Sequence, residues 1–450
     1  MNKQELINII QNHTCNKVKL GVSDIDGVLR GKYISKEKFL ATLDGTLGFC
    51  DVVFGWDVDD RAYEGADFTG WHTGYPDMLL QIDPTTFREI PWENDQPFFL
   101  GQFVTAQNEA IEICPRQLLQ KTINTSLTMG YTPYFSQEFE WFNFQETPET
   151  IRSKGFRQLQ PLTPGMFGYS LLRASLKNDF MTDLFDLLEA FGIPLEGLHT
   201  ETGPGVYEAA IVYADALLAA DRAILFKTAV KEIAYRHGIM ATFMAKWNED
   251  LPGCSGHVHQ SLWDEKTHTN LFYSADNKIS PLMEQYIAGQ LYCLPYILPM
   301  FAPTINSYKR LVEGAWAPTT LTWAHDNRTV ALRVLAGGAK STRLETRVVG
   351  SDTNPYLAIA ACLAAGLYGI RQQLSLNQPA TIGNGYADDK HGRLPGNLKE
   401  ATVQMQQSSV AKELFGENFV QHFCFTRLWE WKQYAKAVSD WELKRYFEII

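Results

Sequence analysis

The stretch from Asn354 to Leu374, NPYLAIAACLAAGLYGIRQQL, constrains the fold more than any other part of this chain. It is apolar on nearly every face, and Pro355 stands near its start, where proline suits the first turn of a helix. A helix with this pattern is buried in a core. The apolar runs Tyr356 to Ile370 and Leu291 to Ile305 are both too short to span a bilayer. We therefore expect a large globular domain around this helix and no membrane partner.

The composition agrees with a globular chain. The 450 residues are 45% hydrophobic and 20% charged, which excludes wholesale disorder and a coiled-coil rod. The net charge of −11 disfavours a nucleic-acid partner. Seven scattered cysteines without a C-x-x-C pair indicate reduced thiols, and the start, MNKQELINII, lacks the apolar stretch of a signal peptide. These features predict a cytoplasmic protein.

The order of patterns along the chain predicts an α+β fold in two parts. VKLGVSDIDGVLRGKYI alternates apolar and polar residues around Asp26-Gly27, a dipeptide suited to a hairpin turn, so the first hundred residues are expected to be rich in strands. Residues 51–74 are expected to form a long functional loop. Helical periods follow at 179–190 and 215–237, and a helical tail, 412–450, is expected to pack back on the domain. We place the domains at residues 1–105 and 106–450.

Four glutamates lie in strand-like or turn-like settings. In YTPYFSQEFEWFNF, an extended chain puts Glu138 and Glu140 on one face, although an exposed strand with paired acids explains the spacing equally well. In LHTETGPGVYEAA, Glu201 and Glu208 flank a Gly-Pro-Gly turn that could bring them together, but acids flank many turns. Neither pair by itself establishes a site.

Two histidines strengthen the case for a metal. GCSGHVHQSL places His257 and His259 two residues apart on one strand face. An H-x-H pair without further ligands is weak support for a metal site. Combined with the glutamates, however, it predicts a hard-cation site suited to Mg²⁺ or Mn²⁺.

Basic residues gather in the same half of this acidic chain. In STRLETRVVG, the residues Arg343, Glu345 and Arg347 alternate on one strand face, which by itself could be a cross-strand ladder of ion pairs. Nearby segments add Lys309, Arg310, Arg328 and Arg333. Fixed guanidinium groups beside divalent cations are what phosphoryl transfer requires. No P-loop, G-x-G-x-x-G or G-x-S-x-G motif stands in a suitable place, which disfavours P-loop kinases, Rossmann enzymes and serine hydrolases.

At these motifs the sequence resembles the glutamine synthetase superfamily over nearly its whole length. The E-x-E strand, the E-to-E turn, the H-x-H element, NSYKRL, NR followed by R, R-x-E-x-R and NPYLA occur in the family's order. The resemblance implies a small N-terminal β-grasp domain, a larger catalytic domain, and double rings, in the usual case dodecamers, with active sites between subunits. It also implies that ATP phosphorylates the glutamate side chain before an amine displaces phosphate.

The resemblance assigns roles position by position. The ligands of at least two Mg²⁺ or Mn²⁺ ions would be Glu140, Glu201 and Glu208 for one ion, and Glu138, His257 and Glu345 for the other. The ATP contacts would be His259, Ser261, Lys340, Arg343 and Arg333, the last facing phosphate together with Arg328. Glutamate would be held by Arg310, Arg347 and Gly253. The aspartate that helps to deprotonate the amine would be Asp57, in a loop whose register an insertion blurs.

Three departures from the family pattern concern the substrates. Trp316 stands where glutamine synthetases carry a flap glutamate, and an indole suits an alkylated or aromatic amine better than ammonium. Alternatively, Trp316 only packs the flap and Glu313 supplies the carboxylate. Pro252 replaces an asparagine that contacts glutamate, and Val206 replaces a glutamine in the E-to-E turn, so the glutamate contacts follow the family pattern less closely than the metal ligands.

Three functions follow from these observations. The flap tryptophan, followed by Ala-Pro-Thr, looks more like the gamma-glutamyl-amine ligases that act on polyamines or monoamines, which predicts an ATP-dependent glutamate:amine ligase. The second is a glutamine synthetase that uses ammonium. The third is a non-catalytic structural relative, which the complete set of six metal ligands argues against because unpaired buried carboxylates are costly.

Overall fold

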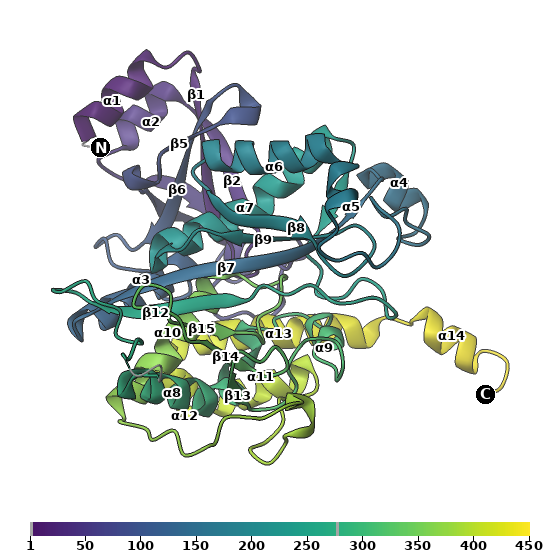
Figure 1. Cartoon of the computed structure of the whole chain (residues 1–450). Coiled ribbons are helices and arrows are strands. Elements are labelled where there is room, and N and C mark those ends of the chain that lie inside the picture. Colours follow the sequence, from purple (N-terminus) through teal and green to yellow (C-terminus); the bar gives the residue numbers. More distant parts are fainter. Residues whose placement is uncertain (1–2, 276–278) are drawn as a thin grey trace.

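The computed structural model describes residues 3–275 and 279–450 (Figure 1). The described residues form two sheets, one of six strands and one of nine, with most of the helices around the larger sheet. The predicted α+β class is confirmed. The smaller sheet uses strands between Lys17 and Val104 and the larger sheet strands between Tyr131 and Thr346. The domain boundary at residue 105 stays a prediction.

The smaller sheet has the strand order β2-β1-β6-β4-β3, with β5 paired to β6. The expected hairpin is present, since β1 and β2 pair antiparallel and Gly27 in the turn has φ +78°. Two helices cover a core that includes Phe39 and Phe99. The elements of this part are α1 (Lys3–Asn12), β1 (Lys17–Ser23), β2 (Leu29–Ser35), α2 (Lys36–Thr42), β3 (Leu47–Cys50), β4 (Asp77–Ile82), β5 (Arg88–Ile90) and β6 (Gln96–Val104).

The expected loop between β3 and β4 contains one short 3-10 turn, η1 (Asp51–Phe54), and is otherwise irregular up to residue 76. Its buried Tyr63 packs edge-on against Trp429 near the C-terminal end of the chain. A buried carboxylate in the same loop, Asp57, accepts a hydrogen bond from the Trp429 indole N–H at 2.9 Å. The loop is therefore tied to the C-terminal helices of its own chain.

The larger sheet has the order β13-β14-β15-β12-β7-β9-β8, with β10 and β11 also paired to β7. The long central strand β7 crosses the molecule in Figure 1. The strands are β7 (Tyr131–Phe144), β8 (Leu195–Thr200), β9 (Val206–Ile211), β10 (Ala214–Asp215), β11 (Met240–Thr242), β12 (Val258–Asp264), β13 (Trp323–His325), β14 (Leu332–Leu335) and β15 (Arg343–Thr346).

Helices cover one face of this sheet and leave the other free for polar side chains. On the covered face, Phe139 of β7 stacks on Phe226 of α7 with ring centroids 5.5 Å apart. The neighbouring side chains of β7, Glu138 and Glu140, point to the opposite face because successive residues of a strand alternate. The helices that follow the smaller sheet in the chain are α3 (Pro115–Thr128), α4 (Pro148–Ser153), α5 (Leu171–Ser175), α6 (Asn178–Ala190), α7 (Ala216–Arg236), α8 (Pro281–Ile297), α9 (Ser307–Arg310), α10 (Pro355–Arg371), α11 (Leu398–Gln407), α12 (Ser409–Phe415), α13 (Glu417–Lys436) and α14 (Asp440–Tyr446).

Helix α10 is the buried central helix that the sequence predicts. The Asn354 side chain caps it by accepting from the Tyr356 N–H, and Pro355 stands in its first turn. The same Asn354 amide donates to the Asp24 carbonyl oxygen at 3.0 Å, which links the helix to the first hairpin. Gly289 of α8 and Gly369 of α10 let the two helices approach closely, since an added methyl group at Gly369 would lie 2.1 Å from the Gln285 carbonyl oxygen.

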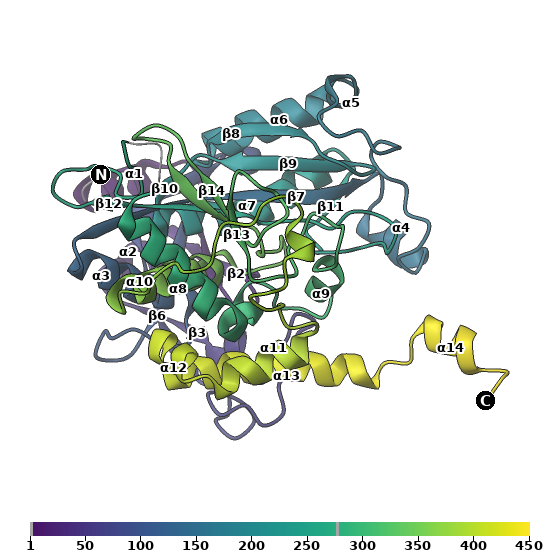
Figure 2. The same ribbon diagram turned by 60° about the horizontal axis from the view of Figure 1, so that its bottom comes forward.

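The expectation that the whole tail packs back on the domain is wrong for its last segment. Helices α12 and α13 pack on the body, but α14 projects away from it, and none of its residues is buried (Figure 2). Its apolar side chains, Trp441 and Leu443 among them, are exposed, although Asp440 forms an ion pair with Arg157. Among the described residues, no helix is long and apolar enough to cross a membrane.

Candidate active site

The strand register aligns one row of candidate ligand side chains across three neighbouring strands. Glu140 of β7 lies directly opposite Glu208 of β9, and Glu208 lies directly opposite His199 of β8. Glu201 follows β8 directly, and its backbone N–H donates to the Val206 carbonyl oxygen at 2.9 Å across the Gly-Pro-Gly turn. The turn thus brings Glu201 and Glu208 together, as the sequence predicts.

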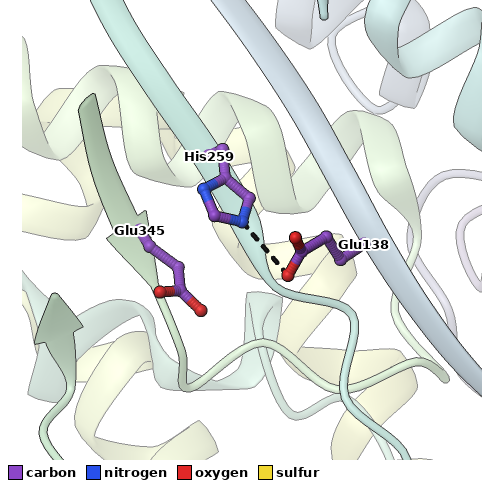
Figure 3. Close-up of side chains that lie close together, drawn as sticks. All are labelled: Glu138, His259 and Glu345. Carbon is purple, nitrogen blue, oxygen red and sulfur yellow. Dashed lines mark ion pairs between the residues drawn. The ribbon is translucent and has the colours of Figure 1, made fainter. Parts of the chain in front are cut away.

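A second row crosses the other half of the sheet. Arg333 of β14 lies opposite Glu345 of β15, which lies opposite His259 of β12. Figure 3 shows Glu345, His259 and the Glu138 carboxylate of β7 converging, with Glu138 Oε2 3.2 Å from His259 Nε2. His257 belongs to the same cluster, since its Nδ1 lies 3.3 Å from Glu345 Oε1 and 3.7 Å from Glu138 Oε2.

Members of both clusters line one cavity of about 580 Å³, whereas His259 faces an adjoining hollow. The cavity contains all six predicted metal ligands and three of the predicted arginines. The predicted residues that line it are Glu138, Glu140, Glu201, Glu208, Gly253, His257, Trp316, Arg328, Arg333, Glu345 and Arg347. Its walls also include Pro252, Tyr169 and His199.

The first cluster, formed by Glu140, Glu201, Glu208 and His199, carries more negative charge than the basic groups around it can balance. Burial, reinforced by the neighbouring carboxylates of Glu140, Glu138 and Glu201, raises the pKa of Glu208 to about 9. Burial also raises the pKa of Glu140, whose Oε2 accepts the Ser255 N–H at 2.7 Å. Carboxylates held together in this way attract a cation strongly.

The second cluster is balanced by basic neighbours. Burial by itself would raise the pKa of Glu345, but Arg347 and the two histidines lower it to about 2. Glu138 behaves alike, since His259 and His257 hold its pKa well below the usual range despite burial. Burial, together with Arg347, lowers the pKa of His257 to about 4, so its imidazole is neutral at pH 7.

The described residues fit divalent cations by the chemistry of their donors. The ligand atoms of Glu138, His259 and Glu345 lie within 4.8 Å of one another, and so do those of His199, Glu201 and Glu208. The buried Nε2 of His257 has no hydrogen-bond partner within the described chain. Imidazole nitrogens and carboxylate oxygens in such a set suit Mn²⁺ or Mg²⁺.

The arginines occupy different depths. Arg333 donates to Glu345 Oε2 at 2.9 Å, and Arg347 pairs with Glu345 as well, whereas Arg328 is exposed at the cavity wall. Arg310 is fully buried outside the cavity lining, where it donates to the carbonyl oxygens of Val348 and Arg347. The structure therefore brings three of these four arginines to the cavity and uses Arg310 to bind backbone beneath it.

The remaining predicted ATP contacts line a second, smaller hollow. His259, Ser261, Lys340 and Arg343 surround it, and Glu138 belongs to both hollows. Arg343 Nε lies 3.2 Å from His259 Nδ1, and the Ser261 hydroxyl accepts from the Trp263 indole at 3.0 Å. This arrangement places a basic, partly aromatic hollow directly beside the second cluster.

Asp57 is not among the described residues that line the cavity of its own chain. Its Oδ1 accepts the N–H groups of Asp59 and Arg61, and its Oδ2 accepts the Trp429 indole N–H. The structure therefore does not bring Asp57 to the cavity within one chain. Val206, at the start of β9, is also buried away from the cavity.

Two aromatic side chains of the cavity are exposed and held in left-handed backbone. Trp316 is 61% exposed at φ +57°, and Tyr169 is 70% exposed at φ +54°. Strained residues of this kind cluster at ligand sites. Within the described lining of the cavity Trp316 is present and Glu313 is absent.

The sequence prediction missed His199 and Tyr169. His199 stands two residues before Glu201, on the strand that leads into the Gly-Pro-Gly turn, so its place on the site face could have been read from the alternation. Tyr169 comes from an irregular segment, and its stacking on His199 at 4.3 Å between ring centroids depends on tertiary packing. No local signal marks it.

Comparisons with known proteins agree with this geometry. Residues 112–446 match the family model described as glutamine synthetase, catalytic domain. The chain is 54% identical to Type-1 glutamine synthetase 2 of Dictyostelium discoideum, with 100% of this chain and 87% of that one covered. It is 38% identical to the glutamate–isopropylamine ligase of a Pseudomonas species, with coverage of 100% and 99%. It also superposes on the solved structure "GmaS/ADP complex-Conformation 1" with a TM-score of 0.85 at 25% identity, with 98% and 99% of the two chains covered.

A sheet that presents clustered carboxylates, histidines and arginines on one face defines an enzyme site suited to charged substrates and divalent cations. The chain belongs to the glutamine synthetase family, and it is a glutamate ligase. The resemblance found in the sequence motifs is confirmed.

Proposed function

We propose that the protein is an ATP- and Mg²⁺-dependent ligase that joins the side-chain carboxylate of glutamate to an organic amine. The observation that supports an organic amine is the position of Trp316. Its exposed indole lines the cavity, whereas Glu313 is not among the lining residues. An indole face attracts an alkylammonium group and offers apolar contact to its carbon atoms. The isopropylamine in the name of the Pseudomonas relative is an amine of this class.

The proposed reaction has two steps. A carboxylate oxygen of glutamate attacks the γ-phosphorus of ATP, the bond to the β,γ-bridging oxygen breaks, and ADP leaves. The bound alkylammonium group first loses a proton, which frees the nitrogen lone pair. The amine nitrogen then attacks the acyl carbon, the carbon–oxygen bond to phosphate breaks, and the nitrogen gives up a second proton. Bound divalent cations would neutralise the phosphate oxygens, and Arg328 and Arg333 at the cavity wall are placed to do the same for the group in transfer.

The other assigned residues have binding roles in this proposal. Arg347 and Gly253 contact glutamate at the cavity wall, and Arg310 supports them from below. His259, Ser261, Lys340 and Arg343 hold the nucleotide in the adjoining hollow. Asp57 of a neighbouring subunit accepts a proton from the amine.

A glutamine synthetase that uses ammonium is the second candidate. The name of the Dictyostelium relative, at 54% identity, favours it. A non-catalytic relative is a third candidate, and the presence of all six expected metal ligands around one cavity speaks against it.

One experiment separates these candidates. ADP formation is measured with glutamate, ATP and Mg²⁺ against a panel of amines: ammonium, methylamine, isopropylamine, ethanolamine and putrescine. The proposal expects turnover with at least one organic amine to exceed turnover with ammonium. Ammonium far above every amine would establish the second candidate, and absence of Mn²⁺ and ATP binding would revive the third.

We further propose a cytoplasmic homo-oligomer, in the form of a double ring and most simply a dodecamer. Reduced cysteines in the cytoplasm agree with the seven unpaired thiols. Exposed apolar residues on the projecting tail, including Trp441, Phe447 and Ile450, support a contact with a second copy. Light scattering coupled to size-exclusion chromatography tests this proposal, since removal of residues 438–450 should reduce the number of subunits in the assembly.

A further inference from the structure

We propose that His199 is a nitrogen ligand of the metal ion in the first cluster. This inference rests on the proposed metal-dependent function and adds a residue to the three glutamates that the family resemblance assigns to that ion. The strand register places His199 directly opposite Glu208, which is itself directly opposite Glu140. His199 is thus the outermost member of a row that already contains two expected ligands.

The distances in the cluster suit a shared ion better than direct hydrogen bonds. His199 Nε2 lies 3.9 Å from Glu208 Oε2, and His199 Nδ1 lies 3.8 Å from Glu201 Oε2. Both separations are too long for a hydrogen bond. Two donor atoms that each lie about 2.1 Å from one ion can be at most about 4.2 Å apart, so the separation between His199 Nε2 and Glu208 Oε2 leaves room for an ion between these two atoms.

The backbone determines which ring nitrogen is free to bind. His199 Nδ1 lies 3.1 Å from the carbonyl oxygen of Thr200. A proton on Nδ1 can be donated to that carbonyl, which leaves the lone pair of Nε2 directed away from it, toward Glu208. Histidines that bind metals commonly donate their second ring N–H to a backbone carbonyl in this manner, which sets the tautomer.

Tyr169 holds the imidazole in place. Its ring stacks on His199 with an interplanar angle of 21°, and its backbone N–H donates to the same Thr200 carbonyl at 2.6 Å. The next residue, Ser170, donates its N–H to the Thr200 hydroxyl at 2.9 Å. A ring fixed on two sides loses little further freedom when it binds a metal.

Nitrogen ligation changes the metal preference that follows from glutamates alone. An oxygen-only cluster suits Mg²⁺, whereas an imidazole nitrogen favours Mn²⁺ and later transition metals. With His199, each of the two clusters combines imidazole with carboxylates. The structure thereby predicts that His199 strengthens Mn²⁺ binding relative to Mg²⁺ binding.

The test measures metal binding by the full-length protein rather than activity. Mn²⁺ is titrated into metal-free wild type and His199→Gln, and free Mn²⁺ is followed by electron paramagnetic resonance. We expect two classes of site in the wild type and at least a tenfold weaker affinity for one class in His199→Gln. His237→Gln serves as the matched control, because His237 is also half-buried and also beside a carboxylate, 2.8 Å from Asp183, but lies outside both clusters. Unchanged affinity of both classes in His199→Gln overturns the inference.

A spectroscopic measurement identifies the ligand atom. In a His257→Gln, His259→Gln background, the second cluster has lost its imidazoles, so ¹⁴N modulation of bound Mn²⁺ must arise from the first. We expect this modulation to be present and to disappear when His199→Gln is added. Mn²⁺ bound without ¹⁴N modulation in this background contradicts the inference alone, whereas a wild-type protein that binds no Mn²⁺ contradicts the proposed function itself.

Discussion

Glu140 and Glu208 face one another directly across antiparallel strands β7 and β9, an arrangement of like charges that destabilises a sheet unless a proton or a cation intervenes. In the metal-free protein the proton takes this place, since burial raises the pKa of Glu208 from 4.5 to about 9. If neither carboxylate is protonated, only a bound cation can relieve the repulsion between Glu140 and Glu208.

The stability of the metal-free protein should therefore fall as pH rises from about 4.5 to about 9. The folded state retains a proton on Glu208 that the unfolded chain releases, so this contribution is complete below the unfolded pKa and is lost through the folded one. Chemical unfolding in a chelator at several pH values measures the slope, at most about 1.4 kcal/mol per pH unit for one proton. Glu208→Gln should flatten it, and the exposed Glu413→Gln should not; equal slopes in all three proteins would refute the assignment.

Glu345→Gln should reduce ADP formation by about 100-fold or more, because it removes a negatively charged metal ligand from the second cluster. It also leaves Arg333 and Arg347 without their shared carboxylate. Activity is measured at saturating Mg²⁺, with circular dichroism to verify folding. Asp326→Asn is the control, since Asp326 pairs with Arg333 from an exposed position. Near-normal activity of Glu345→Gln would remove this residue from the site.

Trp316→Glu should shift preference from organic amines toward ammonium. A carboxylate at this exposed position of the cavity replaces an apolar, cation-attracting face with a point charge suited to a small cation. The readout is the ratio of kcat/KM for the best amine to that for ammonium, which we expect to fall about tenfold or more. Trp316→Phe is the matched variant that keeps an aromatic face and should keep the ratio. An unaltered ratio in Trp316→Glu means that the flap does not select the amine.

Asp221→Asn should destabilise the fold by about 3–5 kcal/mol. Asp221 and Arg116 are both 3% exposed and form a two-pronged pair, with Arg116 Nε 2.9 Å from Asp221 Oδ1, so the substitution leaves a buried guanidinium poorly balanced. Denaturant unfolding of the metal-free protein measures the loss. Disruption of the exposed pair between Arg371 and Glu413 by Glu413→Ala should cost less than about 1 kcal/mol. Comparable losses in the two variants would show that burial does not set the cost.

Gly369→Ala should destabilise the protein by about 1–3 kcal/mol, because the added methyl group would lie 2.1 Å from the Gln285 carbonyl oxygen and would force α8 and α10 apart. Thermal unfolding gives the comparison. At Gly45 an added methyl group meets no atom within 4 Å, so Gly45→Ala is the control and should be neutral or slightly stabilising. A tolerant Gly369 would mean that the helices adjust without loss.

Local patterns were sufficient for the main elements of the fold. The apolar run after Asn354 predicted the buried helix α10, and the alternation around Asp26-Gly27 predicted the β1–β2 hairpin. The same period of two put Glu138 and Glu140 on one face of β7. Patterns failed for the last residues of the chain, where an apolar helical sequence gives no indication of whether its partner is in the same chain.

The sequence by itself determined which side chains share a strand face, because alternation is a property of the extended backbone and needs no partner. Only the tertiary structure decided which strands are neighbours and in what register, and hence that Glu140, Glu208 and His199 form one row. It also decided that Arg310 binds backbone under the cavity and that Asp57 is held by Trp429. These outcomes depend on contacts between segments far apart in the chain, which no local period encodes.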